Sequence, residues 1–432
     1  MGRVPARQEP TSEDGGMTAS THTGGPELAD LYRDLHAHPE PGFAEHRTAG
    51  IAAERLRTLG YEVTTGVGRT GVVGVLRNGA GPVALLRADM DALPVLERTG
   101  LPYASTATTT GPDGSSVPLM HACGHDVHVT CLLGAAAELA ADRSSWRGTL
   151  LVLFQPAEEL GSGARAVLDD GLLDRFGRPD VVLGQHVAPL PAGVLGLTPG
   201  PAFAASDTLH VVLHGRGAHG SRPETSVDPV LMAAATVVRL QGVVAREVAG
   251  TETAVVTVGE LHAGTRANVI PDSAALSVNV RSYDARVRER VLAAVERIVR
   301  AEAAASGAPA EPELTTGESF PAVVNDPGAC ARTRAGFEAD HVAGMVVDPG
   351  PVTGSEDVGL LATAAGVPCV YWLLGGADPA AFAGAASLAD LAEVVRGLPS
   401  NHAPDFAPVI DPTLRTGVAA LVSAARTWLP AG

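Results

Sequence analysis

The segment His121-Ala122-Cys123-Gly124-His125-Asp126-Val127-His128 places three imidazoles, one thiol and one carboxylate in a single short stretch. Imidazole and thiolate are the usual protein ligands of zinc and similar ions, and carboxylates complete that set. Gly124 accepts backbone conformations that other residues avoid, so a turn there can aim Cys123 and His125 at one point. The Ala- and Leu-rich run 129–141 predicts a helix that follows, with Asp126 as its N-cap. The stretch therefore predicts a metal site on the loop that enters a helix.

The cluster fits an open, catalytic metal site better than a structural one. A zinc finger does not fit, because no second Cys-x-x-Cys or His-x-x-x-His pair follows at finger spacing. Histidines with unconnected roles are the alternative, and that alternative is stronger for a single histidine than for this cluster. A catalytic ion keeps one coordination position for water or substrate. We therefore look for further ligands elsewhere in the chain.

Composition narrows the class of protein. The chain has 432 residues, 45% of them hydrophobic, which predicts two or more domains with a sizeable core. The formal charge of −17, from 31 basic and 48 acidic residues, argues against a nucleic-acid partner and against binding to an anionic membrane surface. No lysine occurs, which excludes a P-loop lysine and a lysine Schiff base. No apolar run reaches transmembrane length.

The cysteines and the N-terminal residues predict a location. The four cysteines do not form a small disulfide framework, and Cys131 and Cys369 lie in apolar runs typical of a core. This usage fits a reducing compartment, so we expect a cytoplasmic protein. Residues 1–26 are polar and carry no apolar signal core, so we expect a disordered tail, with Met17 as an alternative start.

Polar groups repeatedly follow apolar runs in the first half of the chain. Helical patterns at 27–38 and 45–59 alternate with strand patterns, which favours an α/β sheet. In such sheets, ligands collect beyond the carboxyl ends of the strands. The runs 83–87, 149–154 and 181–184 lead into Asp89 with Asp91, Glu158 with Glu159, and His186. We expect these groups to surround the same site as the histidine cluster.

The pattern changes at about residue 198. Strands at 207–213, 252–262 and 272–281 are less uniformly apolar, as in a small antiparallel sheet with helices on one face. We predict an α/β catalytic domain made of 27–197 and 315–432, with a smaller α+β domain, 198–314, inserted into it. The Thr-, Ser- and Gly-rich segment 104–118 is either a solvated insertion or a mobile rim over the site.

Several motifs occur together in a characteristic order. They resemble the metal-dependent aminoacylase and hippurate hydrolase family, which includes the indoleacetyl-amino-acid hydrolases and belongs with the co-catalytic zinc exopeptidases. The resemblance covers 28–429. In chain order the motifs are Asp89-Met90-Asp91-Ala92-Leu93-Pro94, His121 to Asp126, Phe154-Gln155-Pro156-Ala157-Glu158-Glu159, Gly184-Gln185-His186, Gly217-Ala218-His219, Asn268-Val269-Ile270-Pro271, Gly354-Ser355-Glu356-Asp357 and His402.

The resemblance implies a fold, a cofactor and a set of roles. The fold would be a mixed-sheet, metallo-exopeptidase-like catalytic domain with an inserted, ferredoxin-like dimerisation domain in a homodimer or higher homo-oligomer. Two divalent ions per subunit, of Zn, Mn, Co or Ni, would be held, with Cys123 bridging them. The ligands would be Cys123, His125, Glu159, His186 and His402.

Other residues would carry the reaction. Glu158 would be the general base that takes a proton from metal-bound water, and Asp91 would orient a ligand. His219 would stabilise the oxyanion in the active site of a partner subunit. Asn268 and Arg281 would contact the substrate carboxylate. The residues alone agree in part: Glu158 and Glu159, if extended, point in opposite directions, so one can bind metal while the other faces substrate. They leave open which does which.

We predict an amidohydrolase that cleaves N-acyl amino acids, of the hippurate or acetyl-amino-acid type, to a carboxylic acid and an amino acid. The alternatives are a dipeptidase or carboxypeptidase on the same scaffold, and a non-catalytic metal-binding homologue. A serine hydrolase does not fit, because no G-x-S-x-G elbow occurs. Glu356 and Asp357 are interpreted as the start of a helix capped by Ser355. Glu224 and the long 104–118 segment depart from the family pattern and bear on substrate choice.

Overall fold

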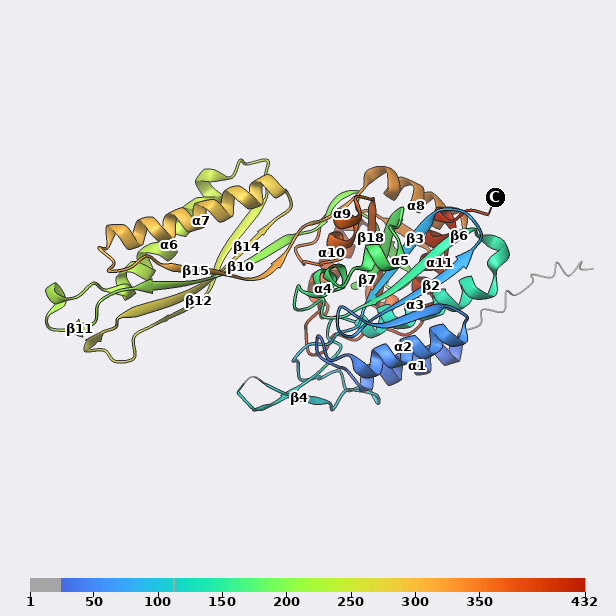
Figure 1. The fold of residues 1–432 in the computed structure, drawn as a ribbon, viewed down its shortest axis with the longest axis horizontal. Helices are drawn as coiled ribbons and strands as arrows, with labels where there is room; N and C mark the ends of the chain where they lie inside the picture. The colour runs from blue at the N-terminus through green and yellow to red at the C-terminus, as the bar shows by residue number, and fades with distance from the viewer. Residues whose placement is uncertain (1–24, 112, 432) are drawn as a thin grey trace, which may run out of the picture.

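The computed structural model describes residues 25–111 and 113–431. The predicted tail, residues 1–26, lies almost wholly outside this range, and Met17 lies outside it. The described chain forms two lobes, each with its own sheet and its own apolar core (Figure 1). The larger lobe combines the first part of the chain with the last part, and the smaller lobe is formed by the residues between them.

A mixed eight-stranded sheet runs through the larger lobe, where the sequence predicts an α/β sheet and the family resemblance implies a mixed one. Its central strands pair in parallel and are almost wholly buried, which explains their continuous apolar sequences. The carboxyl ends of these central strands therefore meet at one edge of the sheet. In spatial order the strands are β1 (Glu62–Val67), β2 (Gly71–Asn78), β6 (Gly148–Gln155), β3 (Val83–Asp89), β7 (Val181–Pro191), β18 (Cys369–Ala377), β8 (Val194–Gly196) and β17 (Met345–Val347).

Helices cover both faces of this sheet. One face packs against α1 (Gly25–Ala37), α2 (His46–Thr58), α3 (His125–Ala141), α8 (Pro327–Ala339) and α11 (Thr413–Trp428). The other packs against α4 (Gly163–Asp169), α5 (Leu172–Phe176) and α9 (Gly359–Ala365). The lobe also contains α10 (Leu388–Gly397) and the 3-10 helices Arg143–Ser145 and Pro379–Phe382. Helix α3 is buried along most of its length, which accounts for the Ala- and Leu-rich sequence that follows its first turn.

The smaller lobe is an antiparallel sheet with two helices on one face. Its elements follow the chain order β-α-β-β-α-β, and its strands lie in the order β12-β14-β10-β15. Alternate residues of β14 are buried, the one-sided pattern that the sequence indicates. The last strand extends past the predicted limit at residue 314. The elements are β10 (Ala205–His214), α6 (Pro229–Glu247), β12 (Ala254–Ala263), β14 (Ser273–Ser282), α7 (Ala285–Ala305) and β15 (Glu313–Phe320), with the 3-10 helix Pro223–Thr225.

Short strand pairs complete the fold. β9 (Gly200–Phe203) pairs with β16 (Val323–Asn325) where the chain enters and leaves the smaller lobe. β11 (Ala218–His219) pairs with β13 (Val269–Ile270) at the far end of that lobe (Figure 1). Within the 104–118 segment, β4 (Thr108–Thr110) and β5 (Ser116–Pro118) form a hairpin that projects from the larger lobe.

One local prediction is wrong. Helix α3 begins at His125, with Gly124 as its N-cap, and Asp126 lies inside the first turn, where it bonds to His36. Among the described residues, α6 has a length and composition that would also suit a membrane-crossing helix. One face of α6 packs into the core of the smaller lobe through Met232, Leu240 and Val243, as expected of a surface helix.

Candidate metal centre

The five predicted ligands converge at the carboxyl edge of the central strands. Cys123 Sγ lies 3.4 Å from His186 Nε2 and 3.3 Å from His402 Nε2. Glu159 Oε1 lies 3.3 Å from His402 Nε2 and 3.8 Å from His125 Nε2. These side chains come from segments far apart in sequence, which the sheet brings to one edge.

The donor atoms fall into two groups that share one thiol. The ligand atoms of Cys123, His125 and His186 lie within 4.8 Å of one another, and so do those of Cys123, Glu159 and His402. The buried ring nitrogens of His125 and Oε1 of Glu159 make no hydrogen bond, although buried polar atoms are nearly always paired. Nitrogen, sulfur and oxygen donors in this combination suit Zn²⁺ and related ions. The residues therefore fit two divalent ions, one at each group, with the Cys123 thiol within reach of both.

Backbone geometry aims the ligands. Gly124 has φ 81°, and a Cβ there would lie 2.3 Å from Cγ1 of Val187, so glycine is required both for conformation and for space. His402 also adopts a left-handed conformation, with φ 71°. Its N–H donates to the carbonyl of Ala122 at 2.8 Å, which fastens the His402 loop to the Cys123 loop.

Hydrogen bonds fix the tautomers of two histidines. His186 Nδ1 donates to the Val187 carbonyl at 2.8 Å, which leaves Nε2 unprotonated and facing Cys123. The Val187 N–H donates to Nε2 of His128 at 2.8 Å, so the His128 proton lies on Nδ1, toward Asp89. The sequence places His128 and Asp89 at this site but assigns neither a specific role. The position of His128 could have been predicted from the sequence, since it lies three residues after His125 and so on the same side of α3.

Asp91 organises the pair of glutamates. Its carboxylate accepts the N–H of Glu158 at 3.1 Å and the N–H of Glu159 at 3.0 Å. Its Oδ1 also lies 3.2 Å from Nδ1 of His125, on the side of the ring away from the other donors. Asp91 thus contacts three of the predicted site residues.

A fully buried arginine lies beneath the site. Arg87 bonds to Asp89 at 2.6 Å, to Glu356 at 2.8 Å and to Asp357 at 3.0 Å. The interpretation of Glu356 and Asp357 as a helix start is wrong, because α9 begins at Gly359 and both carboxylates are buried. Arg87 was also missed, although a single charge inside the apolar run 83–88 is unusual.

The electrostatic environment of the site is strongly negative. Burial raises the pKa of Glu158 well above its usual range, and the carboxylates of Glu356 and Glu159 raise it further. Burial likewise raises the pKa of the Cys123 thiol, again with help from Glu159 and Glu158. Divalent cations would offset this charge, and a thiol bound to such an ion loses its proton.

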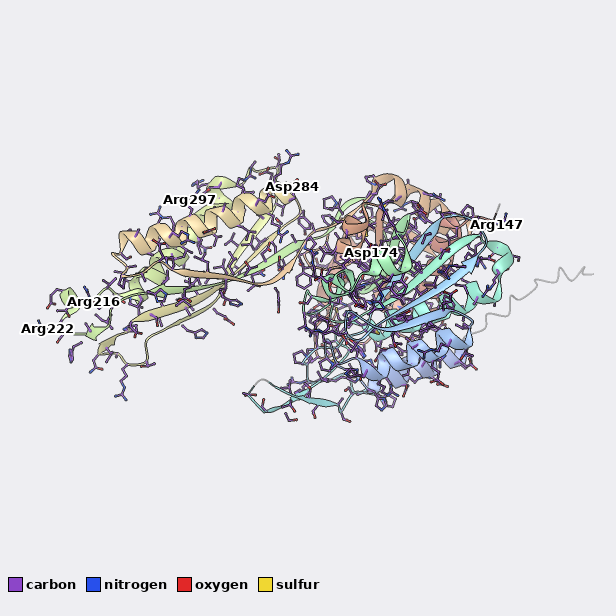
Figure 2. The ribbon with its side chains drawn as sticks, viewed as in Figure 1. Arg147, Asp174, Arg216, Arg222, Asp284 and Arg297 are labelled. Carbon is purple, nitrogen blue, oxygen red and sulfur yellow. The ribbon has the colours of Figure 1, made fainter. Side chains whose placement is uncertain are left out.

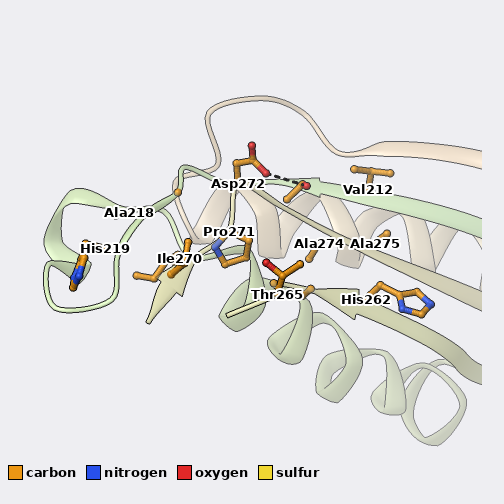
Figure 3. A pocket seen from close by; sticks show the side chains of 15 residues that line it. Val212, Ala218, His219, His262, Thr265, Ile270, Pro271, Asp272, Ala274 and Ala275 are labelled. Atoms are coloured by element: carbon orange, nitrogen blue, oxygen red, sulfur yellow. Dashed lines mark hydrogen bonds between the residues drawn. The ribbon is translucent and has the colours of Figure 1, made fainter. Parts of the chain in front are cut away.

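The remaining predicted residues lie elsewhere in the chain. His219 is exposed at the tip of the smaller lobe, where Gly220 N–H donates to the Asn268 carbonyl at 2.8 Å. A cavity of about 820 Å³ lies alongside, and Figure 3 shows His219 and His262 at opposite ends of its lining. Arg281 lies where the lobes meet, with Nη1 donating to the Thr353 carbonyl at 2.6 Å. Within one chain, neither His219 nor Asn268 joins the five ligands.

Comparisons with known proteins identify relatives of this chain. A family model described as Peptidase family M20/M25/M40 matches residues 85–399. N-acetyl-L-cysteine deacetylase of Bacillus subtilis is 37% identical over 334 residues, which cover 77% of this chain and 76% of that protein. Hippurate hydrolase of Campylobacter jejuni is 42% identical over 273 residues, covering 61% and 68%.

A solved structure is similar over nearly the whole chain. A dinuclear metal binding peptidase of the M20 family from Bacillus subtilis has a TM-score of 0.73 and 29% identity, covering 93% of this chain and 97% of that one. The resemblance drawn from the motifs, to aminoacylases and hippurate hydrolases, is therefore confirmed. The chain belongs to Peptidase family M20/M25/M40.

Proposed function

We propose that this protein is a metal-dependent amidohydrolase that cleaves N-acyl amino acids to a carboxylic acid and a free amino acid. The observation that carries the proposal is the pair of donor groups sharing Cys123, with the carboxylate of Glu158 beside them. The relatives named for N-acetylcysteine and hippurate support this substrate class. Zn, Mn, Co and Ni all remain candidate ions, and a cytoplasmic location remains a prediction.

The proposed roles follow from the donor set. Cys123, His125 and His186 would hold one ion, and Cys123, Glu159 and His402 the other. When bound, such ions lower the pKa of water to about 7 and polarise an amide carbonyl. Glu158 would accept the proton of the attacking water at its carboxylate and pass it to the leaving amide nitrogen. Asp91, which accepts the N–H of Glu158, would hold that carboxylate in place.

His219 would donate to the oxyanion that forms on the acyl carbonyl. Its Nδ1 accepts the Ser221 N–H at 3.1 Å, so the neutral ring carries its proton on Nε2, at an exposed tip. Arg216 and Arg222 flank this turn at the end of the smaller lobe (Figure 2), where positive charge suits an anionic substrate. Because the tip is remote from the ligands of its own chain, His219 would serve a partner subunit. Asn268, at the same tip, and Arg281 would contact the substrate carboxylate.

A homodimer formed through the smaller lobe would allow this. Helix α6 exposes Leu231 by 69% and Val238 by 73%, seven residues apart and so on nearly the same side of the helix. Strand β12, against which α6 packs, is at the edge of its sheet and leaves backbone groups open to pairing. Together they offer an apolar and hydrogen-bonding surface for a second copy. The smaller lobe would then be the inserted, ferredoxin-like dimerisation domain.

The test is a substrate panel on the metal-reconstituted protein. Hippurate and N-acetyl amino acids are assayed beside free dipeptides and peptides with a free C-terminus. We expect kcat/KM to be highest for the acyl amino acids. Preference for free dipeptides would replace the proposal with the dipeptidase alternative. Absence of turnover on every substrate, by protein shown to be metal-loaded, would favour a non-catalytic homologue.

A further inference from the structure

Asn401 lies where the segments that carry three of the ligands meet. Its side-chain Nδ2 donates to the Cys123 carbonyl at 3.1 Å and to the Val187 carbonyl at 3.0 Å. The next residue is His402, whose N–H donates to the Ala122 carbonyl. One dipeptide thus contacts the backbone of the Cys123 loop and of the strand that carries His186.

The orientation of the Asn401 amide follows from its partners. Both partners are carbonyl oxygens, which only accept, so the amide must present its two N–H groups to them. The Val187 carbonyl also accepts a hydrogen bond from Nδ1–H of His186 at 2.8 Å. That bond leaves His186 Nε2 unprotonated. A carbonyl oxygen has two lone pairs, so both bonds form together. Asn401 therefore holds the Val187 carbonyl in place, and that carbonyl in turn orients the His186 ring.

We propose that Asn401 is a positioning residue that holds Cys123 Sγ and His186 Nε2 at the spacing an ion requires. It acts through the backbone, since its Nδ2 lies 4.0 Å from Cys123 Sγ and an amide nitrogen has no lone pair to offer a metal. The inference rests on the proposed metal centre and adds to it a residue outside the donor set.

The Asn401→Asp variant separates shape from hydrogen bonding. The aspartate has the same shape, but its carboxylate cannot donate, and it faces two carbonyl oxygens that repel it. The Cys123 and Val187 backbones then lose their common anchor. Loss of a partner that orients metal ligands lowers metal affinity by about 10–100-fold, and we expect a loss in this range.

Asn78→Asp is the matched control. Asn78 is half-buried, like Asn401, and its Nδ2 also donates to two carbonyls, those of Arg143 and Trp146, at 2.6 Å each. It pairs with Gly148 at the start of β6, whereas the metal centre follows the end of that strand. A general loss of stability should affect both variants, but a loss of metal positioning should affect only Asn401→Asp.

The experiment titrates metal-depleted, full-length protein with Co²⁺ and follows the thiolate-to-cobalt charge-transfer absorption. We expect the wild type and Asn78→Asp to develop this band at the same free Co²⁺. Asn401→Asp should require about 10–100-fold more. Thermal melts of the metal-depleted proteins check folding. If Asn401→Asp is unfolded, Asn401→Ala removes the donors without adding charge and should shift the titration in the same direction.

Two results would overturn the inference in distinguishable ways. If the wild type and the folded Asn401 variants give the same Co²⁺ titration with the charge-transfer band present, Asn401 does not position the ligands, and the proposed metal centre stands. Co²⁺ bound by the wild type without a thiolate band would contradict the bridging role of Cys123, and with it both the proposed metal centre and this inference.

Discussion

At the scale of single residues, the pKa values of the two adjacent glutamates, Glu158 and Glu159, shift in opposite directions. Burial raises the pKa of Glu158, and the neighbouring carboxylates add to that effect. Burial also raises the pKa of Glu159, but His402, whose Nε2 lies 3.3 Å from Glu159 Oε1, and the nearby His125 outweigh that effect and lower it. Glu159 therefore suits a metal ligand, which must be ionised, and Glu158 suits a group that gains and loses a proton. The residue types alone left this assignment open.

The first prediction concerns Glu158→Gln. The amide keeps the shape of the side chain but cannot accept a proton, so kcat should fall by about 10²–10⁴-fold. Metal content should stay near that of the wild type. Steady-state kinetics and elemental analysis measure the two effects separately. Activity within about tenfold of the wild type would place the base elsewhere, and loss of metal would make Glu158 a ligand.

The second prediction concerns His36, a buried histidine of α1 that bonds to Asp126 at 2.7 Å and to Glu97 at 3.0 Å. Burial alone lowers the pKa of His36, but these two carboxylates outweigh it and raise the pKa to about 10. The folded state therefore holds this proton more tightly than the unfolded state, whose pKa is near 6.5. The stabilisation is complete below about pH 6.5 and is lost as the pH rises toward 10.

His36→Gln removes this pH-dependent contribution. At pH 6 the variant should unfold with a free energy a few kcal/mol below that of the wild type, and the difference should shrink steadily by pH 10. Urea unfolding at several pH values measures it. His38→Gln, at an exposed histidine, is the control and should show little effect at any pH. If the difference in unfolding free energy between the wild type and His36→Gln stays constant or grows with pH, His36 does not carry a charge in the folded protein.

The residues proposed as metal ligands, and Asp91 beside them, could be picked out from the sequence, whereas Asn401 and Arg87 could not. Cys123, His125 and Glu159 belong to compact local motifs, so their chemistry is visible in the chain itself. Asn401 bonds to carbonyls of Cys123 and Val187, and Arg87 bonds to Glu356, all distant in sequence. Backbone carbonyls leave no trace in a sequence, and such partners appear only once the sheet has formed.

At the scale of elements, α6 has apolar residues on two faces, one of which is buried and the other exposed. Met232, Leu240 and Val243 are buried in the core of the smaller lobe, while Leu231 and Val238 are exposed. A helix that is apolar on both sides is normally covered on both. The three strands predicted for this lobe correspond closely to β10, β12 and β14, whereas β15 was not predicted, because it is largely exposed and its sequence lacks an apolar run.

The third prediction concerns that exposed face of α6. Replacing Leu231 and Val238 together by Asp puts charge into the proposed subunit contact, so the protein should become monomeric. Light scattering measures the change, with the helical circular dichroism unaltered. Ala301→Asp, on the exposed side of α7, is the matched control and should leave the mass unchanged. A dimer that persists in the double variant would place the contact elsewhere.

At the scale of the whole molecule, contacts between segments far apart in sequence join the two lobes. The paired strands β9 and β16 connect them, and Tyr283 and Arg281 of the smaller lobe bond to the carbonyls of Val352 and Thr353. The α/β class was predictable, because buried parallel strands have distinctive continuous apolar sequences. The relative position of the lobes was not, since it depends on such contacts between distant loops.

The fourth prediction tests sharing of the active site between subunits. His219→Ala should lower kcat by about 10²–10³-fold without loss of metal, the usual effect of removing one oxyanion donor. When His219→Ala and Glu158→Gln proteins are unfolded and refolded together, each heterodimer has one site with both residues intact, so part of the activity should return. Heterodimers that form without regaining activity would show that His219 does not act across subunits.

We propose above all that amide hydrolysis depends on two divalent ions, held by the two donor groups that share Cys123. The most direct measurement is activity on an N-acyl amino acid as a function of ions bound per subunit. The chelated protein should be inactive, and activity should rise to its maximum as two ions bind, because each donor group would hold one. Full activity in protein that elemental analysis shows to be free of metal would contradict the account.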